Sequence, residues 1–506
     1  MARLTCPGAV LPRIIQDASA VPAFRLSPFR WRLVAASISM SLVMWLLPGA
    51  ARPVLAASTT RVSVASDGTQ ANASSGEPVI SSDGRYVTFS SDASNLVSGD
   101  TNAVTDVFVY DRLAGTVERV SVDGAGNQGN GASNAVNLSG DGRFVVFNSS
   151  ATNLVLGDTN GAVDVFLHDR LTGATERISV NTAGIEGNGS SQGDTDISDD
   201  GRFVAFQSDA TNFVTGDTNG TTDVFVRDRT AGTTSLVSIS TTGTVGNARS
   251  PENSGCQISP NGRYVVFPSI ATDLVPGDTN GQNDVFLRDL MTGTTERISV
   301  SSSGTQGNGL SAWPDVSTDG RFVVYSSLAT NLVGGDNNNT WDDFVRDRQA
   351  GTTERVSLGP GGIEANANSG YTSISSDGRI VAFTSRATNL VSGDTNGIRD
   401  VFVRDRLLGV TERVSVSSSG AQATGPDNEI GLTSVSADGR FVVFSFSGTD
   451  LVPGDTNGVP DAFIRDRVAA TTPGAPALAL PQLTVLLALL GLIGGRLSRN
   501  TYRGCA

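Results

Sequence analysis

The sequence has 506 residues but no lysine, one histidine (His168) and only three cysteines. A single histidine excludes a multi-histidine metal site. The 36 basic residues, all arginine, face 50 acidic residues, and the net charge of −14 leaves no basic surface to neutralise nucleic-acid phosphates. We therefore expect no nucleic-acid partner. Cys6, Cys256 and Cys505 are too few for a disulfide framework, and we interpret Cys256 as a small buried side chain and His168 as a surface residue.

The N-terminal segment has the pattern of an export signal. Five arginines precede an uncharged run at 33–47, and Val54-Leu55-Ala56 is a small-residue cleavage site. We assign residues 1–56 to a signal peptide, with an uncleaved anchor as the alternative. The protein is then exported, to the bacterial envelope, the cell surface or the medium.

The C-terminal segment, 473–506, combines a Pro/Ala-rich linker, an apolar run at 483–495 and three arginines after it. This order resembles the PEP-CTERM and IPTL-CTERM sorting signals of bacterial surface proteins, although neither Pro-Glu-Pro nor Ile-Pro-Thr-Leu is present. The alternative is a plain transmembrane helix that anchors the chain.

Residues 57–472 contain seven repeats of about 59 residues, each marked by a GDTNG-like segment. Such a period, with short apolar runs between Gly, Asn and Asp turns, indicates units that bury themselves against their neighbours. The second repeat predicts four strands, at 135–139, 143–148, 164–169 and 176–180. The second of these is apolar on both faces, which is typical of a blade packed between two others.

The two ends of the repeat region complement each other. Thr60-Arg61-Val62-Ser63-Val64 matches a fourth strand without three strands before it, whereas the seventh repeat lacks its own fourth strand. We therefore predict an all-β, seven-bladed propeller whose N-terminal strand closes the ring and removes the open edge.

The repeat resembles the TolB-type, WD-repeat-like Asp propeller family. The resemblance rests on the turn Ser82-Asp83-Gly84-Arg85 and on the third-strand segment from Asp106 to Asp111, and both recur across 60–467. It implies the propeller fold. The functions of that family are too diverse to imply one here.

Every repeat also carries the motif Asp-x-Asn-x-x-x-Asp. A hard cation with six to eight oxygen ligands would offset these carboxylates, so we predict Ca²⁺ sites, with metal-free turns or another ion as alternatives. Glycine follows the asparagine in five copies, and we expect the copies with Ala103 and Asn339 there to bind most weakly. The predicted ligands are Asp100, Asn102, Asp106; Asp158, Asn160, Asp164; Asp217, Asn219, Asp223; Asp278, Asn280, Asp284; Asp336, Asn338, Asp342; Asp394, Asn396, Asp400; and Asp455, Asn457, Asp461.

A single ligand site requires residues that are not repeated in all seven copies, and the fifth repeat differs most from the others. It contains Trp313 and Trp341, and Tyr371 follows in the next repeat. Aromatic rings stack on sugars, so these three are candidate glycan ligands, with simple packing as the alternative.

The leading hypothesis is a secreted or surface-held module that binds a protein or glycan at its loop face, stabilised by calcium. Two alternatives remain: a hydrolase or lyase acting on a polysaccharide, and a structural envelope protein without a ligand. An enzyme would need non-repeated carboxylates in one pocket, and the candidates are Glu77, Glu186, Glu252, Glu364, Asp427 and Glu429.

Overall fold

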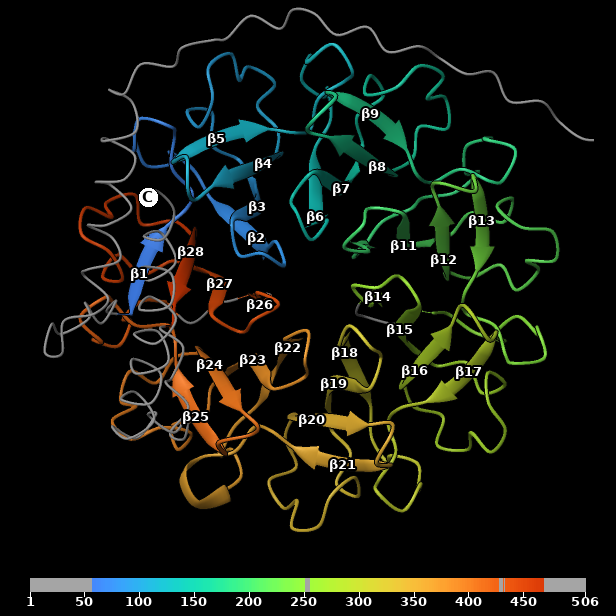
Figure 1. The fold of residues 1–506 in the computed structure, drawn as a ribbon, viewed down its shortest axis with the longest axis vertical. Coiled ribbons are helices and arrows are strands. Elements are labelled where there is room, and N and C mark those ends of the chain that lie inside the picture. Colours follow the sequence, from blue (N-terminus) through green and yellow to red (C-terminus); the bar gives the residue numbers. More distant parts are fainter. Residues whose placement is uncertain (1–56, 251–254, 427–430, 432, 468–506) are drawn as a thin grey trace, which may run out of the picture. The chain divides into compact units, whose positions relative to one another are not determined.

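Short apolar segments alternating with glycine turns form a ring of seven antiparallel sheets around a central axis (Figure 1). The computed structural model describes residues 57–250, 255–426, 431 and 433–467. The predicted signal peptide and C-terminal tail lie outside these residues. In the described part of the chain, no helix has the length and hydropathy needed to cross a bilayer. The predicted all-β, seven-bladed propeller is confirmed.

Each blade has four strands, numbered here from the axis outwards. The first strands are β2 (Ser75–Ile80), β6 (Ser133–Leu138), β10 (Asp196–Ile197), β14 (Gln257–Ile258), β18 (Ser311–Val316), β22 (Ser369–Ile374) and β26 (Thr433–Val435). The second strands are β3 (Tyr86–Ser91), β7 (Phe144–Ser149), β11 (Phe203–Ser208), β15 (Tyr264–Ser269), β19 (Phe322–Ser327), β23 (Ile380–Ser385) and β27 (Phe441–Phe446).

The third strand of every blade begins and ends with aspartate. These strands are β4 (Asp106–Asp111), β8 (Asp164–Asp169), β12 (Asp223–Asp228), β16 (Asp284–Asp289), β20 (Asp342–Asp347), β24 (Asp400–Asp405) and β28 (Asp461–Asp466). The fourth strands are β5 (Thr116–Arg119), β9 (Ala174–Arg177), β13 (Thr233–Leu236), β17 (Thr294–Arg297), β21 (Thr352–Arg355), β25 (Val410–Arg413) and β1 (Ser58–Arg61). A 3-10 turn, η1, spans Pro360–Gly362.

The N-terminal strand closes the ring, as predicted. β1 pairs antiparallel with β28 from Ser58 opposite Asp466 to Arg61 opposite Phe463, and so completes the seventh blade. Val62, directly after β1, is fully buried in the cluster between blades seven and one. Closure therefore joins the first and last described segments of the chain in one sheet.

The core lies between blades. Seven hydrophobic clusters, one at each blade boundary, combine residues of adjacent sheets. In the first blade Phe89 of the second strand stacks on Phe108 of the third, with centroids 5.8 Å apart. Both rings are fully buried. The apolar second and third strands thus keep the blades in contact and leave the loops free to differ.

The observed strands of the second blade differ slightly from the prediction. β6 begins two residues earlier than expected, and β9 spans Ala174–Arg177 where residues 176–180 were predicted. The expectation for His168 was wrong. It is 7% exposed, and its Nδ1 forms a hydrogen bond with Thr175 Oγ1 at 2.9 Å. This third-strand position faces the preceding blade: Arg288, its equivalent in the fourth blade, is also buried and donates to the Ser240 carbonyl. Cys256 is fully buried, as predicted.

Candidate functional site

The Asp-x-Asn-x-x-x-Asp motif forms a tight polar cluster in each blade. In the first blade Asn102 Nδ2 donates to Asp106 Oδ2 at 3.0 Å and to the Gly129 carbonyl at 3.1 Å. Ser121 donates to Asp106 Oδ1 at 2.5 Å. The asparagine therefore fastens the motif to the loop that follows the fourth strand, so the two loops share one face of the ring.

An arginine of the fourth strand lies between the two aspartates of the motif. Arg119 NH1 is 3.3 Å from Asp100 and 3.2 Å from Asp106. The same contact recurs in six of the seven blades, through Arg61, Arg119, Arg177, Arg297, Arg355 and Arg413. A guanidinium there supplies the positive charge that the sequence analysis assigned to calcium, and calcium binding at these six motifs stays a prediction.

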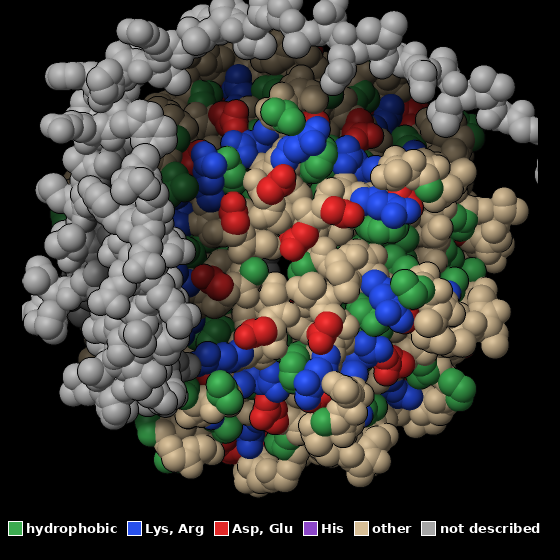
Figure 2. Space-filling model, viewed as in Figure 1, with side chains coloured by type: hydrophobic (Ala, Val, Ile, Leu, Met, Phe, Trp, Pro, Cys, Tyr) green, Lys and Arg blue, Asp and Glu red, His purple; other side chains and the backbone are tan. Residues whose placement is uncertain are grey.

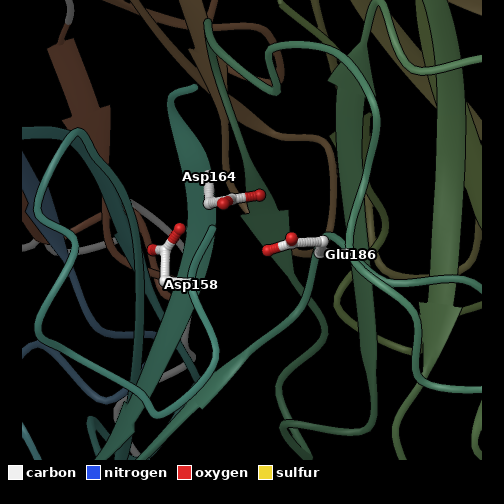
Figure 3. Close-up of side chains that lie close together, drawn as sticks. All are labelled: Asp158, Asp164 and Glu186. Atoms are coloured by element: carbon white, nitrogen blue, oxygen red, sulfur yellow. The ribbon is translucent and has the colours of Figure 1, made fainter. Parts of the chain in front are cut away.

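The second blade adds a third carboxylate to its motif. Figure 3 shows Asp158, Asp164 and Glu186 facing a common space, close enough for their oxygens to share an ion. Arg177 NH1 lies 3.5, 3.1 and 2.5 Å from these three residues in the same order. The cluster therefore already contains a cation, the arginine itself.

The backbone turn does not depend on glycine. Gly161 has a φ of 65°, and Ala103 and Asn339 take φ values of 55° and 53° at the same position. Both non-glycine residues accept the left-handed conformation at some energetic cost, so the turn is preserved in all seven copies.

The three aromatic candidates come together in one cluster. Trp313 lies 4.9 Å from Trp341 and 4.7 Å from Tyr371, measured between ring centroids, and all three are half-buried. Trp313 and Tyr371 occupy β-bulges of β18 and β22 and have positive φ values of 50° and 58°. Because a bulge re-aims its side chain, the two rings of adjacent blades meet. We call Trp313, Trp341 and Tyr371 the aromatic cluster.

A buried acid lies close to the aromatic cluster. Asp343, fully buried in β20, accepts a hydrogen bond from Ser326 at 2.6 Å, and its Oδ2 has no partner. Burial raises the pKa of Asp343 well above its ordinary value and so favours the neutral form of the acid. Gly370 lies against both Ser326 and Trp313, which places the acid and the rings at the same blade boundary.

The central channel also contains carboxylates. It has a volume of about 160 Å³ and is lined by the first strands, including Asp196 and Asp315. Burial raises the pKa of Asp315 to about 6 and that of Asp196 well above its usual range. Each side chain accepts a hydrogen bond from a backbone N–H of the next blade: Asp315 from Ile374, and Asp196 from Ile258.

Four acids whose pKa values are raised by burial were not among the residues expected from the sequence: Asp194, Asp196, Asp315 and Asp343. Alignment of the repeats could have pointed to Asp196 and Asp315, because the equivalent first-strand residues of the other five blades are uncharged. They are Val79, Asn137, Gln257, Ser373 and Ser434. Burial raises the pKa of Asp194 to about 6, and the nearby Glu77 carboxylate adds to the shift. Above about pH 6, where Asp194 and Asp315 are ionised, these carboxylates make the channel unfavourable for an anionic ligand.

Arginine and acidic side chains lie among one another on the face drawn in Figure 2, without a continuous patch of one sign. In every blade an arginine after the first turn contacts the last aspartate of the third strand, as Arg143 does with Asp169 at 2.7 Å. That contact lowers the pKa of Asp169. Because these charges are already paired with one another, they offer little to a ligand. Each exposed pair contributes only a small stabilisation to its turn.

Comparisons with known proteins give only distant structural likenesses. No family model and no curated protein matches the sequence. Similar solved structures include an oligogalacturonate lyase in complex with manganese, with 10% identity, a TM-score of 0.49, and coverage of 81% of this chain and 93% of that one. An oligogalacturonate lyase from Vibrio parahaemolyticus has 12% identity, a TM-score of 0.46 and coverage of 82% and 92%. TolB from Acinetobacter baumannii has 15% identity, a TM-score of 0.35 and coverage of 71% and 75%. At these scores the likenesses carry no argument about ligands.

Proposed function

We propose that this chain is an exported, surface-associated propeller that binds a neutral glycan at the aromatic cluster. The observation that carries the proposal is the meeting of Trp313, Trp341 and Tyr371, three residues that the other repeats lack, at one boundary of a ring whose blades are otherwise alike. Half-buried rings, tilted against one another by 50° and 38°, offer apolar faces to the C–H faces of a sugar ring.

The charge around the channel favours a neutral glycan over an acidic one. Asp194, Asp196, Asp315 and Glu77 line the channel or a small cavity beside it. Carboxylates in that position repel uronates and sulfated sugars. Export is supported by the N-terminal sequence pattern, which lies outside the described residues.

The polysaccharide-acting enzyme remains the alternative, and the described candidates give it little support. Glu186 and Glu364 are bound to Arg177 and Arg355. Asp196 and Asp315 already accept two backbone N–H groups each. Glu252, Asp427 and Glu429 lie outside the described residues.

Tryptophan fluorescence reads the proposed site directly, because the other two tryptophans, Trp31 and Trp45, precede the predicted cleavage site. We expect neutral oligosaccharides to shift the emission of the processed chain in a saturable way, and charged ones to bind more weakly. Trp341→Thr, which copies Thr105 and Thr222 of other blades, should lower affinity about tenfold, or about 1.4 kcal/mol. Tyr110→Ala, at a half-buried ring elsewhere, is the matched control and should bind normally.

The result that would reject the proposal is a full screen of neutral glycans without any change in emission or melting temperature. Cleavage of a glycan, detected as new reducing ends or unsaturated products, would favour the enzyme instead. Silence in both assays would favour a structural envelope role.

A further inference from the structure

The third blade is the exception among the seven Asp motifs. Leu236 ends β13 where six fourth strands end in arginine. Val245 stands where the other blades have glutamine or glutamate, as shown by its bridge to Ile239. In the fourth blade that position matters, because Gln306 donates to Asp278 at 2.8 Å and to Asp284 at 2.9 Å. The third blade therefore lacks both the arginine of the other six blades and the glutamine or glutamate at the second position.

The aspartates themselves are retained. Asp223 still accepts hydrogen bonds from Ser238 at 2.5 Å and from Asn219 at 2.8 Å. Asp217 is 9% exposed, and its Oδ1 is buried without a hydrogen-bond partner. Among the described residues no arginine forms an ion pair with either carboxylate. Burial raises the pKa of Asp223 to about 6, and the like charge of Asp217 adds a smaller contribution in the same direction.

The other blades show what the vacant position holds. In the second blade Arg177 contacts Asp158 Oδ1 and Asp164 Oδ2, and its NH2 donates to the Gly157 carbonyl at 2.9 Å. The fifth blade repeats this with Arg355, Asp336, Asp342 and Gly335. Besides the oxygen of Glu186 or Glu364, each of these two sites thus directs three oxygens at one positive charge. In the third blade the same chain positions are Asp217, Asp223 and Gly216, while Leu236 packs on the apolar cluster that contains Phe213.

We infer that the third blade binds one Ca²⁺ in place of the missing guanidinium, with Asp217 and Asp223 as its carboxylate ligands. Two carboxylates and a backbone carbonyl are hard oxygen donors of the kind that Ca²⁺ prefers, and water fills the remaining positions. The six motifs in which an arginine already lies between the aspartates then need no ion, so one Ca²⁺ site is expected instead of seven. The inference does not depend on a ligand at the aromatic cluster.

The test uses the full chain after chelation, with Ca²⁺ as the probe. Calorimetry should give one ion per chain, and the melting temperature should rise with Ca²⁺ in the way that any ligand specific to the folded state produces. Leu236→Arg should abolish binding and raise the melting temperature in chelator toward that of the calcium-loaded native chain. Asp217→Asn should abolish binding without that rise.

Arg119→Leu is the matched variant in the first blade. It removes the guanidinium there and leaves Gln128, which donates to Thr101 and not to the aspartates, so we expect it to bind a second Ca²⁺. Four results would overturn the inference: no ion bound by the native chain, seven ions bound, a stoichiometry unchanged by Leu236→Arg, or binding of Mg²⁺ without Ca²⁺. Because Leu236→Arg is expected to stabilise the fold, a loss of binding in that variant is not explained by unfolding.

Discussion

Asp343 occupies a position that is valine in five blades and alanine in the seventh. The carboxyl keeps one hydrogen bond, to Ser326, and leaves Oδ2 buried without a partner. An unsatisfied buried polar atom costs about 1–3 kcal/mol. A residue that destabilises the fold beside the aromatic cluster is a candidate for a functional constraint.

Replacing Asp343 by valine should therefore stabilise the protein by about 1–2 kcal/mol, because the variant restores the residue of the other blades. Denaturant unfolding of the native and variant chains measures the difference. Asp343→Asn keeps a polar group in the cavity and should give little or no gain. Equal or lower stability of Asp343→Val would show that the buried acid has a partner at this boundary. A stabilised variant with weaker glycan binding would link the acid to the site.

The first strands connect neighbouring blades through buried carboxylates, and this makes stability depend on pH. Burial raises the pKa of Asp315 from 3.8 to about 6 and also raises that of Asp194 to about 6. Between about pH 4 and pH 6 these two carboxyls are still protonated in the folded chain but have lost their protons in the unfolded chain. The free energy of unfolding should then decrease as the pH rises from about 4 to about 6.

Asp315→Asn isolates one of these groups and copies Asn137 of the second blade. In the variant the slope of unfolding free energy against pH should be shallower by up to one proton, which is about 1.4 kcal/mol per pH unit. Chemical unfolding at several pH values measures both slopes. The arginine-paired aspartates, such as Asp169, have lowered pKa values and lose their contribution below about pH 4, outside this window. Parallel slopes for the two chains would contradict the assignment.

The sequence was sufficient to predict the blades, because each repeat carries its own turn, its apolar second strand and its Asp-flanked third strand. The closure by β1 followed from an unmatched fourth strand at the start of the repeat region and a missing fourth strand at its end. The grouping of Trp313, Trp341 and Tyr371 was predicted only as nearness in sequence. Their contact depends on bulges in β18 and β22, and no residue pattern marks a bulge at tryptophan or tyrosine.

The arginine in the Asp motif was missed for a physical reason. Arg119 lies 13 residues after Asp106 on another strand, and only the antiparallel pairing of β4 with β5 brings the two together. An arginine in a strand of alternating residues is usually interpreted as facing solvent. From the sequence alone, the two aspartates of the motif therefore looked unpaired. Comparison of the seven copies would have shown that Leu236 is the exception.

Ring closure makes the stability of the whole propeller depend on one short strand. Removal of residues 57–64 would leave β28 with an unpaired edge and would expose the cluster that contains Val62, whose burial alone contributes about 2 kcal/mol. We expect the shortened chain to melt at a lower temperature and to form oligomers, measured by calorimetry and by light scattering after size exclusion.

A synthetic peptide of residues 57–66, added to the shortened chain, should restore the melting temperature, and a scrambled peptide of the same composition should not. A shortened chain that melts as the intact one does would show that the seventh blade is stable with three strands.

The pairing of Ser58 with Asp466 also determines how the molecule responds to force. Those two residues sit at the same end of the β1–β28 ladder, so tension applied between them separates its hydrogen bonds one after another, like a zipper, instead of shearing them together. Blades one to six carry no load until that ladder has parted. The closing strand is thus the mechanically weakest part of the ring. Tension between its two ends opens the seventh blade first and leaves the other six sheets intact.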